Sequence, residues 1–535
     1  MYSNEIFELI KKVEATRQER VAALPDRPVR MTADEKTELL RKFHPDHIDS
    51  EFDLLKIGPN AGEKVPKELA RLLQGKSMLL NSKYTKIDLT KTDFETDILI
   101  IGGGGAGCAA GIIASEYGAK VTIATKLRIG DANTMMAEGG IQAAVKENDS
   151  PATHYLDAFG GGHFAAQADL LKKLVSDGPG AIKWLDELGV MFDKDADGVM
   201  ITTHGGGTSR KRMHAAADYT GKEIMRTLRD EVQNRGIEVM DYTAAIELLL
   251  DEDGKACGAI LQNMETGDNL TARAKVVILA TGGAGRLHYQ GFPTSNHYGA
   301  TADGLVLAYR AGVPLLYADT FQYHPTGVAY PQQLFGALVT EKVRALGAML
   351  VNIDGEAFVH PLETRDVAAA AVIRECKERR KGIDIGEGSG IWLDSPIIET
   401  IKGEGTIERS IPAMMKMFLN YGIDMRKVPV LIYPTLHYQN GGVSISENGE
   451  TAVPNLLAAG EVVGGIHGRN RLMGNSLLDV IVFGRNAGHT AGAKFVNIKP
   501  GNLSLAHVTK FESERAAAGI TEATPSPMLL PDYTR

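Results

Sequence analysis

The hydrophobic pattern of the chain separates an N-terminal extension from the body that follows it. In residues 1–92, which are rich in charge and low in glycine, apolar side chains recur at helical spacing, as in residues 5–13. Thr32 followed by Glu35 fits a capping box ahead of Leu39, which predicts the start of a second helix. We therefore expect a mostly helical extension that wraps the body or docks a partner.

The pattern then changes to continuous apolar runs that end in glycines. Residues 97–101 form such a run, as expected for a strand buried in a parallel sheet. A helical pattern over 106–117 and a second strand over 120–125 complete a βαβ unit. Further buried strands are predicted at 275–281 and 456–459.

These strands are separated by a long insertion, which predicts a divided domain. We expect an α/β fold in which a Rossmann-like domain with a parallel sheet is interrupted by an α+β capping domain. The boundaries expected are 1–92 for the extension, 93–318 and 434–500 for the two parts of the Rossmann-like domain, 319–433 for the capping domain and 501–535 for a short, partly helical tail.

Composition narrows the classes of function. The net charge is −9, and acidic and basic residues are interspersed, which argues against nucleic acid as a partner. Cys108, Cys257 and Cys376 lie too far apart in sequence for a Cys-x-x-Cys pair, so the chain cannot ligate an iron–sulfur cluster or attach a c-type haem by itself. No signal peptide and no apolar run of transmembrane length is visible. We expect a cytoplasmic protein without a membrane span of its own.

A glycine-rich loop lies between the first predicted strand and helix. Residues 102–107 read Gly-Gly-Gly-Gly-Ala-Gly and satisfy G-x-G-x-x-G in the context that gives this pattern meaning. The glycines let the backbone approach a pyrophosphate, which lies on the N-terminus of the helix. Thr125 and Lys126 stand where a ribose-binding acid would follow the second strand, so a nicotinamide cofactor is disfavoured.

The segment that follows resembles a known family. Residues 131–144 are similar to the stretch that lines the isoalloxazine in the succinate dehydrogenase/fumarate reductase flavoprotein family, where Thr-Lys after the second strand is also usual. The resemblance covers about residues 97–495 and implies FAD as the cofactor. In membrane-bound members a histidine here carries a covalent flavin link. Asn133 occupies the matching position, so we expect non-covalent FAD and a bias toward reduction.

The resemblance also implies which residues hold FAD. These residues lie in the glycine loop, at the end of the second strand, in the isoalloxazine segment and in three later stretches. They are Gly102, Gly104, Gly105, Ala106, Gly107, Thr125, Lys126, Asn133, Thr134, Gly139, Gly140, Asp303, Glu461, Ser476 and Leu477.

Two separate stretches, 321–327 and 465–477, resemble two walls of a dicarboxylate site in this family. By this resemblance His324 and Thr340 would bind one carboxylate, and His437 and Arg471 the other. A guanidinium suits a planar anion because it can donate two parallel hydrogen bonds. Polarising both carboxylates withdraws electron density from the double bond between them.

The same family implies a proton donor and a relay. Arg365 matches the donor, although Thr364 replaces the family's proline before it. Glu341 and Arg344, three residues apart, match the relay that resupplies the proton, and Lys342 replaces the family's glycine between them. The function expected is FAD-dependent reduction of the C=C bond of fumarate, or of a closely related unsaturated dicarboxylate, to succinate.

Alternatives of other kinds remain open. L-aspartate oxidase shares most of these residues, but His204 stands where that enzyme places a glutamate for the substrate's ammonium, so His204 is a candidate substrate contact. Further possibilities are succinate oxidation and a non-catalytic role in electron relay within a larger complex. Because the chain has no cluster or haem ligands, we expect an electron-donor partner that carries iron–sulfur clusters or flavin, with residues 1–92 as its candidate dock.

Overall fold

A sheet of seven strands forms the centre of the larger part of the molecule, which we call the body. The computed structural model describes residues 2–24, 28–80, 87–287, 289–386, 388–522 and 524–531. The strand order is β10–β11–β12–β4–β5–β9, and β20 also pairs with β12. These strands are β4 (Phe94–Ile101), β5 (Val121–Ala124), β9 (Glu238–Met240), β10 (Thr243–Leu250), β11 (Ala256–Asn263), β12 (Asn269–Leu279) and β20 (Leu456–Ala458).

The part of the sheet around β4 is parallel, as the apolar runs predict. Strand β4 pairs in parallel with β5 and β12, and β12 pairs in parallel with β20. Helix α4 (Gly105–Ser115) follows β4 and packs closely against α15 (Asn475–Lys494). Gly484 and Gly488 permit this approach, because an added Cβ would lie 2.6 Å from the oxygen of Ala106 and 2.5 Å from that of Ala110, respectively.

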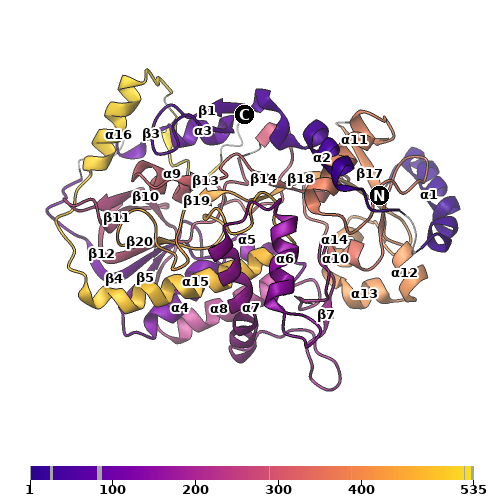
Figure 1. The fold of residues 1–535 in the computed structure, drawn as a ribbon, viewed down its shortest axis with the longest axis horizontal. Helices are drawn as coiled ribbons and strands as arrows, with labels where there is room; N and C mark the ends of the chain where they lie inside the picture. The colour runs from indigo at the N-terminus through magenta and orange to yellow at the C-terminus, as the bar shows by residue number, and fades with distance from the viewer. Residues whose placement is uncertain are drawn as a thin grey trace.

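The remaining elements of the body surround this sheet (Figure 1). They are α5 (Asn133–Met136), β6 (Ile141–Gln142), α6 (Pro151–Gly161), α7 (Ala168–Glu187), β7 (Thr202–Thr203), β8 (Met213–His214), α8 (Thr220–Asn234), α9 (Asp303–Arg310), β13 (Leu315–Leu316) and β19 (Gly442–Val443). The three cysteines are free thiols and are buried. Among the described helices, none is long and apolar enough to cross a membrane.

A second sheet, in the region of the expected insertion, forms a separate cap with its own hydrophobic core. Its strands pair antiparallel in the order β14–β18–β17–β15, with β16 on β17. The cap elements are β14 (Phe321–Val328), α10 (Lys342–Ala345), β15 (Met349–Val351), α11 (Arg365–Lys377), β16 (Ile383–Asp384), β17 (Ser389–Asp394), α12 (Ile397–Lys402), α13 (Thr406–Ser410), α14 (Pro412–Leu419) and β18 (Val430–Gln439). Strand β18 thus continues across the boundary expected at 433/434.

The N-terminal extension packs on both the cap and the body. It contains α1 (Asn4–Ala22), α2 (Ala33–Phe43), β1 (Phe52–Leu54), β2 (Lys64–Pro66), α3 (Lys67–Leu73) and β3 (Lys76–Ser77). The capping box is confirmed, since Thr32 and Glu35 exchange both hydrogen bonds. Ile10, Val13 and Leu39 belong to the cap core, whereas residues of α3 belong to the core of the body.

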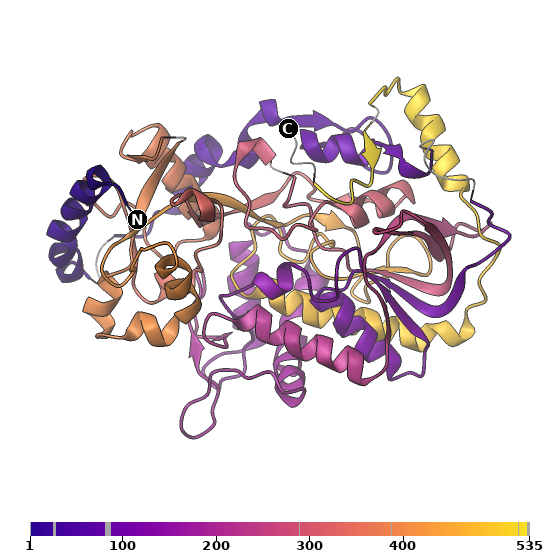
Figure 2. The same cartoon turned by 180° about the vertical axis from the view of Figure 1, so that it is seen from behind.

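Buried ion pairs fix the first helix to the cap. Arg17 and Arg20 of α1 each pair at 2.8 Å with the fully buried carboxylate of Asp394 in β17. In Figure 2 this indigo helix lies on the outside of the cap, at the end of the molecule opposite the yellow C-terminal helix α16 (Ala506–Ala517). The tail then returns as β21 (Pro525–Ser526), which pairs in parallel with β3.

Candidate active site

A cavity of about 560 Å³ runs from the end of β4 to the cap. Its wall contains most of the residues expected to hold FAD and two of those expected to bind substrate. These are Gly102, Gly104, Gly105, Ala106, Thr125, Lys126, Asn133, Thr134, Asp303, Glu461, Ser476 and Leu477, together with His437 and Arg471. The cavity therefore joins the predicted nucleotide loop to one of the predicted carboxylate clamps.

The glycine loop gives this cavity its backbone-lined end. Gly102 has φ +118°, and a Cβ added there would lie 2.2 Å from the oxygen of Ala280. A Cβ on Gly107 would lie 1.9 Å from the oxygen of Gly102. Helix α4 begins after Gly104, so its N-cap residue has no side chain to cover the N–H groups of the first turn. This arrangement fits the pyrophosphate of FAD.

The half-buried Lys126 follows the end of β5 and bridges it to the start of α9. The Lys126 ammonium donates to Thr301 Oγ1 and to Asp303 Oδ2, both at 2.6 Å. The second strand of such a fold marks the ribose side of the nucleotide, so this cluster lies at the adenosine end of the cavity.

Asn133 has its whole amide engaged by the protein. Its Nδ2 donates to Asn296 Oδ1 at 2.8 Å and to Glu461 Oε2 at 3.0 Å, and its Oδ1 accepts from the His297 N–H at 2.6 Å. Burial raises the pKa of Glu461, although the hydrogen bond from Asn133 opposes this shift. Asn133 thus anchors the segment that carries it.

Gly139 and Gly140 pack behind the isoalloxazine segment. An added Cβ would meet Met473 at 3.2 Å from Gly139 and the oxygen of His214 at 2.6 Å from Gly140. Gly139 thus allows the segment to approach the 465–477 stretch closely, and Gly140 allows it to approach β8.

Two buried arginines meet on one amide oxygen. Gln322 Oε1 accepts from Arg365 Nη1 and from Arg471 Nη2, each at 3.0 Å. The Gln322 amide in turn donates to Asn470 Oδ1 at 2.9 Å and to the oxygen of Arg471 at 2.6 Å. The guanidinium of Arg471 also lies 4.3 Å from the ring centroid of Tyr438. Gln322 therefore sets the separation of the two cationic groups.

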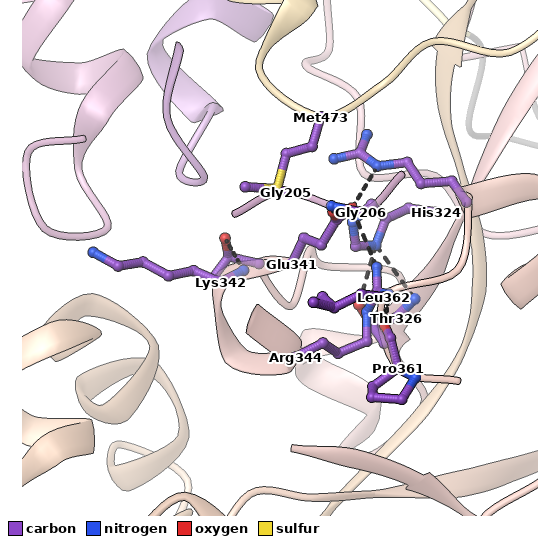
Figure 3. Close-up of polar contacts among 12 residues, drawn as sticks. Gly205, Gly206, His324, Thr326, Glu341, Lys342, Arg344, Pro361, Leu362 and Met473 are labelled. Atoms are coloured by element: carbon purple, nitrogen blue, oxygen red, sulfur yellow. Dashed lines mark hydrogen bonds and ion pairs between the residues drawn. The ribbon is translucent and has the colours of Figure 1, made fainter. Parts of the chain in front are cut away.

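The three residues of the expected proton relay form a chain of buried contacts. Glu341 Oε2 lies 2.9 Å from Arg365 Nε and 3.2 Å from Arg344 Nη2. Glu341 Oε1 accepts from the Gly206 N–H at 2.6 Å, and Figure 3 shows these two residues reaching toward each other. Arg344 also donates to the oxygen of Pro361. Glu341 is the N-cap residue of α10 (Lys342–Ala345) and Arg344 follows three residues later, a spacing that brings the two side chains together.

The buried charges of this cluster shift the pKa values of Glu341 and Arg471. Burial alone raises the pKa of Glu341, but the charges of Arg365 and Arg344 outweigh burial and hold that pKa below the ordinary value. Burial, reinforced by the charge of Arg365, lowers the pKa of Arg471 to about 9. Both groups remain ionised at neutral pH.

The two expected histidine clamps are neutral. Burial, followed by the charge of Arg365, holds the pKa of both His324 and His437 well below the ordinary value. His324 Nδ1 accepts from the Thr326 N–H at 3.3 Å, so the proton of the neutral ring is on Nε2. The two rings lie 5.1 Å apart, and His437 Nδ1 lies 2.8 Å from Ser295 Oγ. Each histidine can thus donate one hydrogen bond without carrying charge.

Lys342 and His204, which differ from the residues of the related families, do not belong to the chain formed by Arg344, Glu341 and Arg365. Lys342 turns away from the relay, and its ammonium donates to the oxygen of Ala217 at 2.7 Å. Thr340 is buried and its Oγ1 accepts from the Lys342 N–H at 3.4 Å. His204 is partly exposed and directly precedes the Gly205–Gly206 turn that contacts Glu341; burial and then the charges of Lys211 and two arginines lower its pKa.

Gln322 is the site residue that the sequence interpretation missed. It lies inside the stretch that carries His324, but a glutamine is not itself an ionisable or nucleophilic group. Its role depends on two arginines that are 43 and 149 residues away in sequence. The one available signal was its position two residues before His324.

The fold and the site together define a flavin-dependent oxidoreductase. Residues 97–477 match the model of the FAD binding domain family. The chain is 40% identical over 408 residues to a subunit of the fumarate reductase (CoM/CoB) from Methanothermobacter marburgensis, a match that covers 74% of this chain and 72% of that protein. It is 35% identical over 415 residues to the L-aspartate oxidase of Streptomyces coelicolor, covering 74% and 69% of the two chains.

A solved structure shows the same fold. The FrdA chain of E. coli quinol fumarate reductase superposes with a TM-score of 0.72 at 30% identity, over 80% of this chain and 74% of that one. The protein belongs to the FAD binding domain family, among the fumarate reductase and succinate dehydrogenase flavoproteins, and FAD is its cofactor.

Proposed function

We propose that this protein reduces the C=C bond of fumarate, or of a closely related unsaturated dicarboxylate, to succinate. The observation that carries the proposal is the buried chain Arg344–Glu341–Arg365, which reaches Arg471 through Gln322. A site that only relays electrons has no use for such a path, because a path of alternating acid and base groups serves proton transfer.

The charge of this cluster suits a dianion. Three buried arginines, Arg344, Arg365 and Arg471, surround the single carboxylate of Glu341, which leaves two positive charges uncompensated among these four side chains. Burying an unbalanced charge is costly unless a counter-charge arrives. A dicarboxylate supplies two negative charges, so its binding relieves this imbalance.

The two carboxylates would be held by different kinds of donor. Arg471 and His437 line the cavity and would bind one, while His324 Nε2 and Thr340 would bind the other. Neutral histidines donate hydrogen bonds without adding to the positive charge. Holding both ends polarises the double bond and stabilises the charge that develops on the substrate during reduction.

Bound FAD, once reduced by an electron donor, would supply the hydride that adds to one carbon of the double bond. Arg365 would donate a proton to the neighbouring carbon, which becomes strongly basic as the hydride arrives. An arginine has a pKa above about 12, so it can act as an acid only toward such a base. Glu341 and Arg344 would then return a proton to Arg365 along the buried chain.

The test is anaerobic oxidation of the chemically reduced protein by fumarate, followed by flavin absorbance. Fumarate should oxidise the flavin rapidly, and Arg365→Gln should slow this step by about 10³-fold, within the range for loss of a general acid. Arg226→Gln, at a partly exposed pair with Glu223 on α8, is the matched control and should behave as wild type. Fumarate reduction that survives Arg365→Gln would remove Arg365 from the role of acid.

We also propose that FAD is held without a covalent bond. The support is Asn133, whose amide cannot form the link and is fully engaged by Asn296, Glu461 and His297. Acid precipitation should leave the yellow colour in the supernatant. A yellow pellet would contradict the proposal.

Oxidation of L-aspartate is the second candidate, favoured by the 35% identity to the S. coelicolor L-aspartate oxidase. Against it, His204 replaces the expected acid, and an imidazole is either neutral or positive, so it offers no negative charge to an ammonium group. Burial and nearby cations lower the pKa of His204, which favours the neutral ring. Adding L-aspartate to the oxidised protein without oxygen distinguishes the two. Bleaching of the flavin by L-aspartate, with no response to fumarate, would establish the oxidase instead.

Electrons would come from a partner that carries iron–sulfur clusters or flavin, since one relative is named as one subunit of its enzyme.

The N-terminal extension packs on the cores of both the cap and the body, which supports a structural role rather than a role in docking the partner. Deleting residues 2–80 should therefore abolish fumarate reduction by a reduced dye as well as by the partner. If the activity with the dye remained, the docking role of the extension would be restored.

A further inference from the structure

The C-terminal segment Pro525–Pro531 ends at the adenosine side of the FAD cavity. The main-chain oxygen of Leu529 accepts hydrogen bonds from Lys126 Nζ at 2.5 Å and from Thr301 Oγ1 at 3.1 Å. Lys126 and Asp303 line the cavity, and the same ammonium is bonded to the Asp303 carboxylate. Leu529 is therefore the third acceptor that fixes this lysine, and it comes from the last residues of the chain.

The segment is held in place at several points. Ser526 Oγ donates to the oxygen of Leu72 at 2.7 Å, and Arg310 Nη2 donates to the oxygen of Ser526 at 3.1 Å. Gly75 allows the close approach, because an added Cβ would lie 2.7 Å from Ser526 Cβ. The tail is thus clamped between the N-terminal extension and α9 of the body.

The side chain of Leu529 closes the space behind the cavity wall. It is 4% exposed and belongs to one buried cluster with Met78, Ala244 and Ile246. Ala244 itself lines the cavity. Met78 and Leu529, both outside the 97–477 family match, therefore pack behind the cavity wall at Ala244.

We infer that the Pro525–Pro531 segment is a positioning element of the FAD site that retains the cofactor through its adenosine diphosphate half. It fixes the Lys126 ammonium with a main-chain acceptor and buries the back of the cluster. A cation held in place binds an anionic or hydroxyl-rich group better than one that must be ordered on binding. The segment acts through Lys126, so it governs retention of the cofactor rather than the chemistry.

A pair of neighbouring leucines supplies the test. Leu529→Ser removes a buried side chain and loosens the tail, whereas Leu530→Ser makes the same change at an exposed position. The dissociation constants of FAD, ADP and FMN are measured with the apoprotein of each full-length variant. Loss of one charge-assisted hydrogen bond predicts affinities for FAD and ADP that are weaker by about tenfold in Leu529→Ser and unchanged in Leu530→Ser.

FMN is the internal control, because it lacks the adenosine half. Its affinity should be the same in all variants. Gly75→Ala displaces the tail from the opposite side without touching the cavity wall, and should reproduce the effect if Leu529→Ser fails to fold. Unchanged FAD and ADP binding in Gly75→Ala, or an equal loss of FMN binding, would overturn the inference.

Discussion

The FAD end of the cavity and the arginine cluster that we propose as its carboxylate end are built from different kinds of chemical group. At the FAD end, glycines bring backbone close to backbone, as where a Cβ on Gly102 would lie 2.2 Å from the oxygen of Ala280. At the carboxylate end, buried ionised side chains contact one another, as in the Arg365–Glu341 pair at 2.9 Å. The first end recognises by shape and main-chain dipoles, the second by net charge.

This difference separates retention of the cofactor from reaction of the substrate. A steric change at the glycine loop should remove FAD, whereas a change of charge at the arginine cluster should leave FAD bound and alter turnover. Substitutions on either side of that division should therefore have distinguishable effects.

The largest effect is expected from Gly102→Ala. The added Cβ collides with Ala280, and φ +118° is unfavourable for alanine, so the loop cannot keep the shape that cradles the pyrophosphate. FAD should be essentially absent from the purified variant, as read from the ratio of flavin to protein absorbance. Gly160→Ala, where an added Cβ meets nothing within 4 Å, should retain full FAD.

Glu341→Gln should be next in size. The amide keeps the shape of the side chain but cannot return a proton to Arg365, so kcat for fumarate should fall by about 100-fold. KM should not rise, because the cluster becomes more positive. FAD content should equal that of wild type and of the exposed control Glu356→Gln. Equal kcat in Glu341→Gln and wild type would mean that the proton arrives by another route.

Gln322→Met should have a smaller effect on the same side. Methionine fills a similar volume but offers no strong acceptor to Arg365 and Arg471, so the separation of the two guanidinium groups is no longer fixed. We expect kcat/KM for fumarate to fall by about tenfold, the cost of roughly one hydrogen bond. Steady-state kinetics with FAD-loaded protein measures it, and an unchanged kcat/KM would show that the arginines hold their own positions.

The smallest effect is expected from protonation of His214, a buried histidine that lies against Gly140. Burial lowers the pKa of His214 to about 4, below an unfolded value of about 6.5. The unfolded chain therefore binds the extra proton first, and stability that is fully present above pH 6.5 is lost as the pH falls toward 4. At pH 5 the loss from this residue is roughly 2 kcal/mol.

Urea unfolding at pH 7 and pH 5 measures this loss. The variant His214→Gln has no group that titrates there and should show a shallower decline of the unfolding free energy than wild type. An identical decline in both proteins would assign the acid sensitivity to other buried groups, such as His154, whose pKa burial also lowers to about 4.

The FAD end could be predicted from the sequence because its signals are local. The apolar run before Gly102 and the helical pattern after it lie within a few residues of each other, and the structure confirms them as β4 and α4. Thr32 and Glu35 likewise reveal a capping box within a single turn. Patterns of this kind depend only on neighbouring residues.

The carboxylate end could be predicted only through resemblance, and Gln322 not at all. The side chains of this end come from strands and helices that are far apart in sequence. No pattern among neighbouring residues can therefore predict how they are arranged. The same holds for the extension: the spacing of Ile10 and Val13 predicts a buried helical face but does not say which surface covers it.

The N-terminal residues pack against partners that are synthesised much later. The Tyr2 hydroxyl donates to the oxygen of Pro429 and accepts from the Leu431 N–H, partners more than 400 residues further along the chain. At roughly 5–20 residues per second, the ribosome needs on the order of tens of seconds to deliver them. Until these partners have been synthesised, Tyr2 and the helix that follows it cannot complete their native packing on the cap.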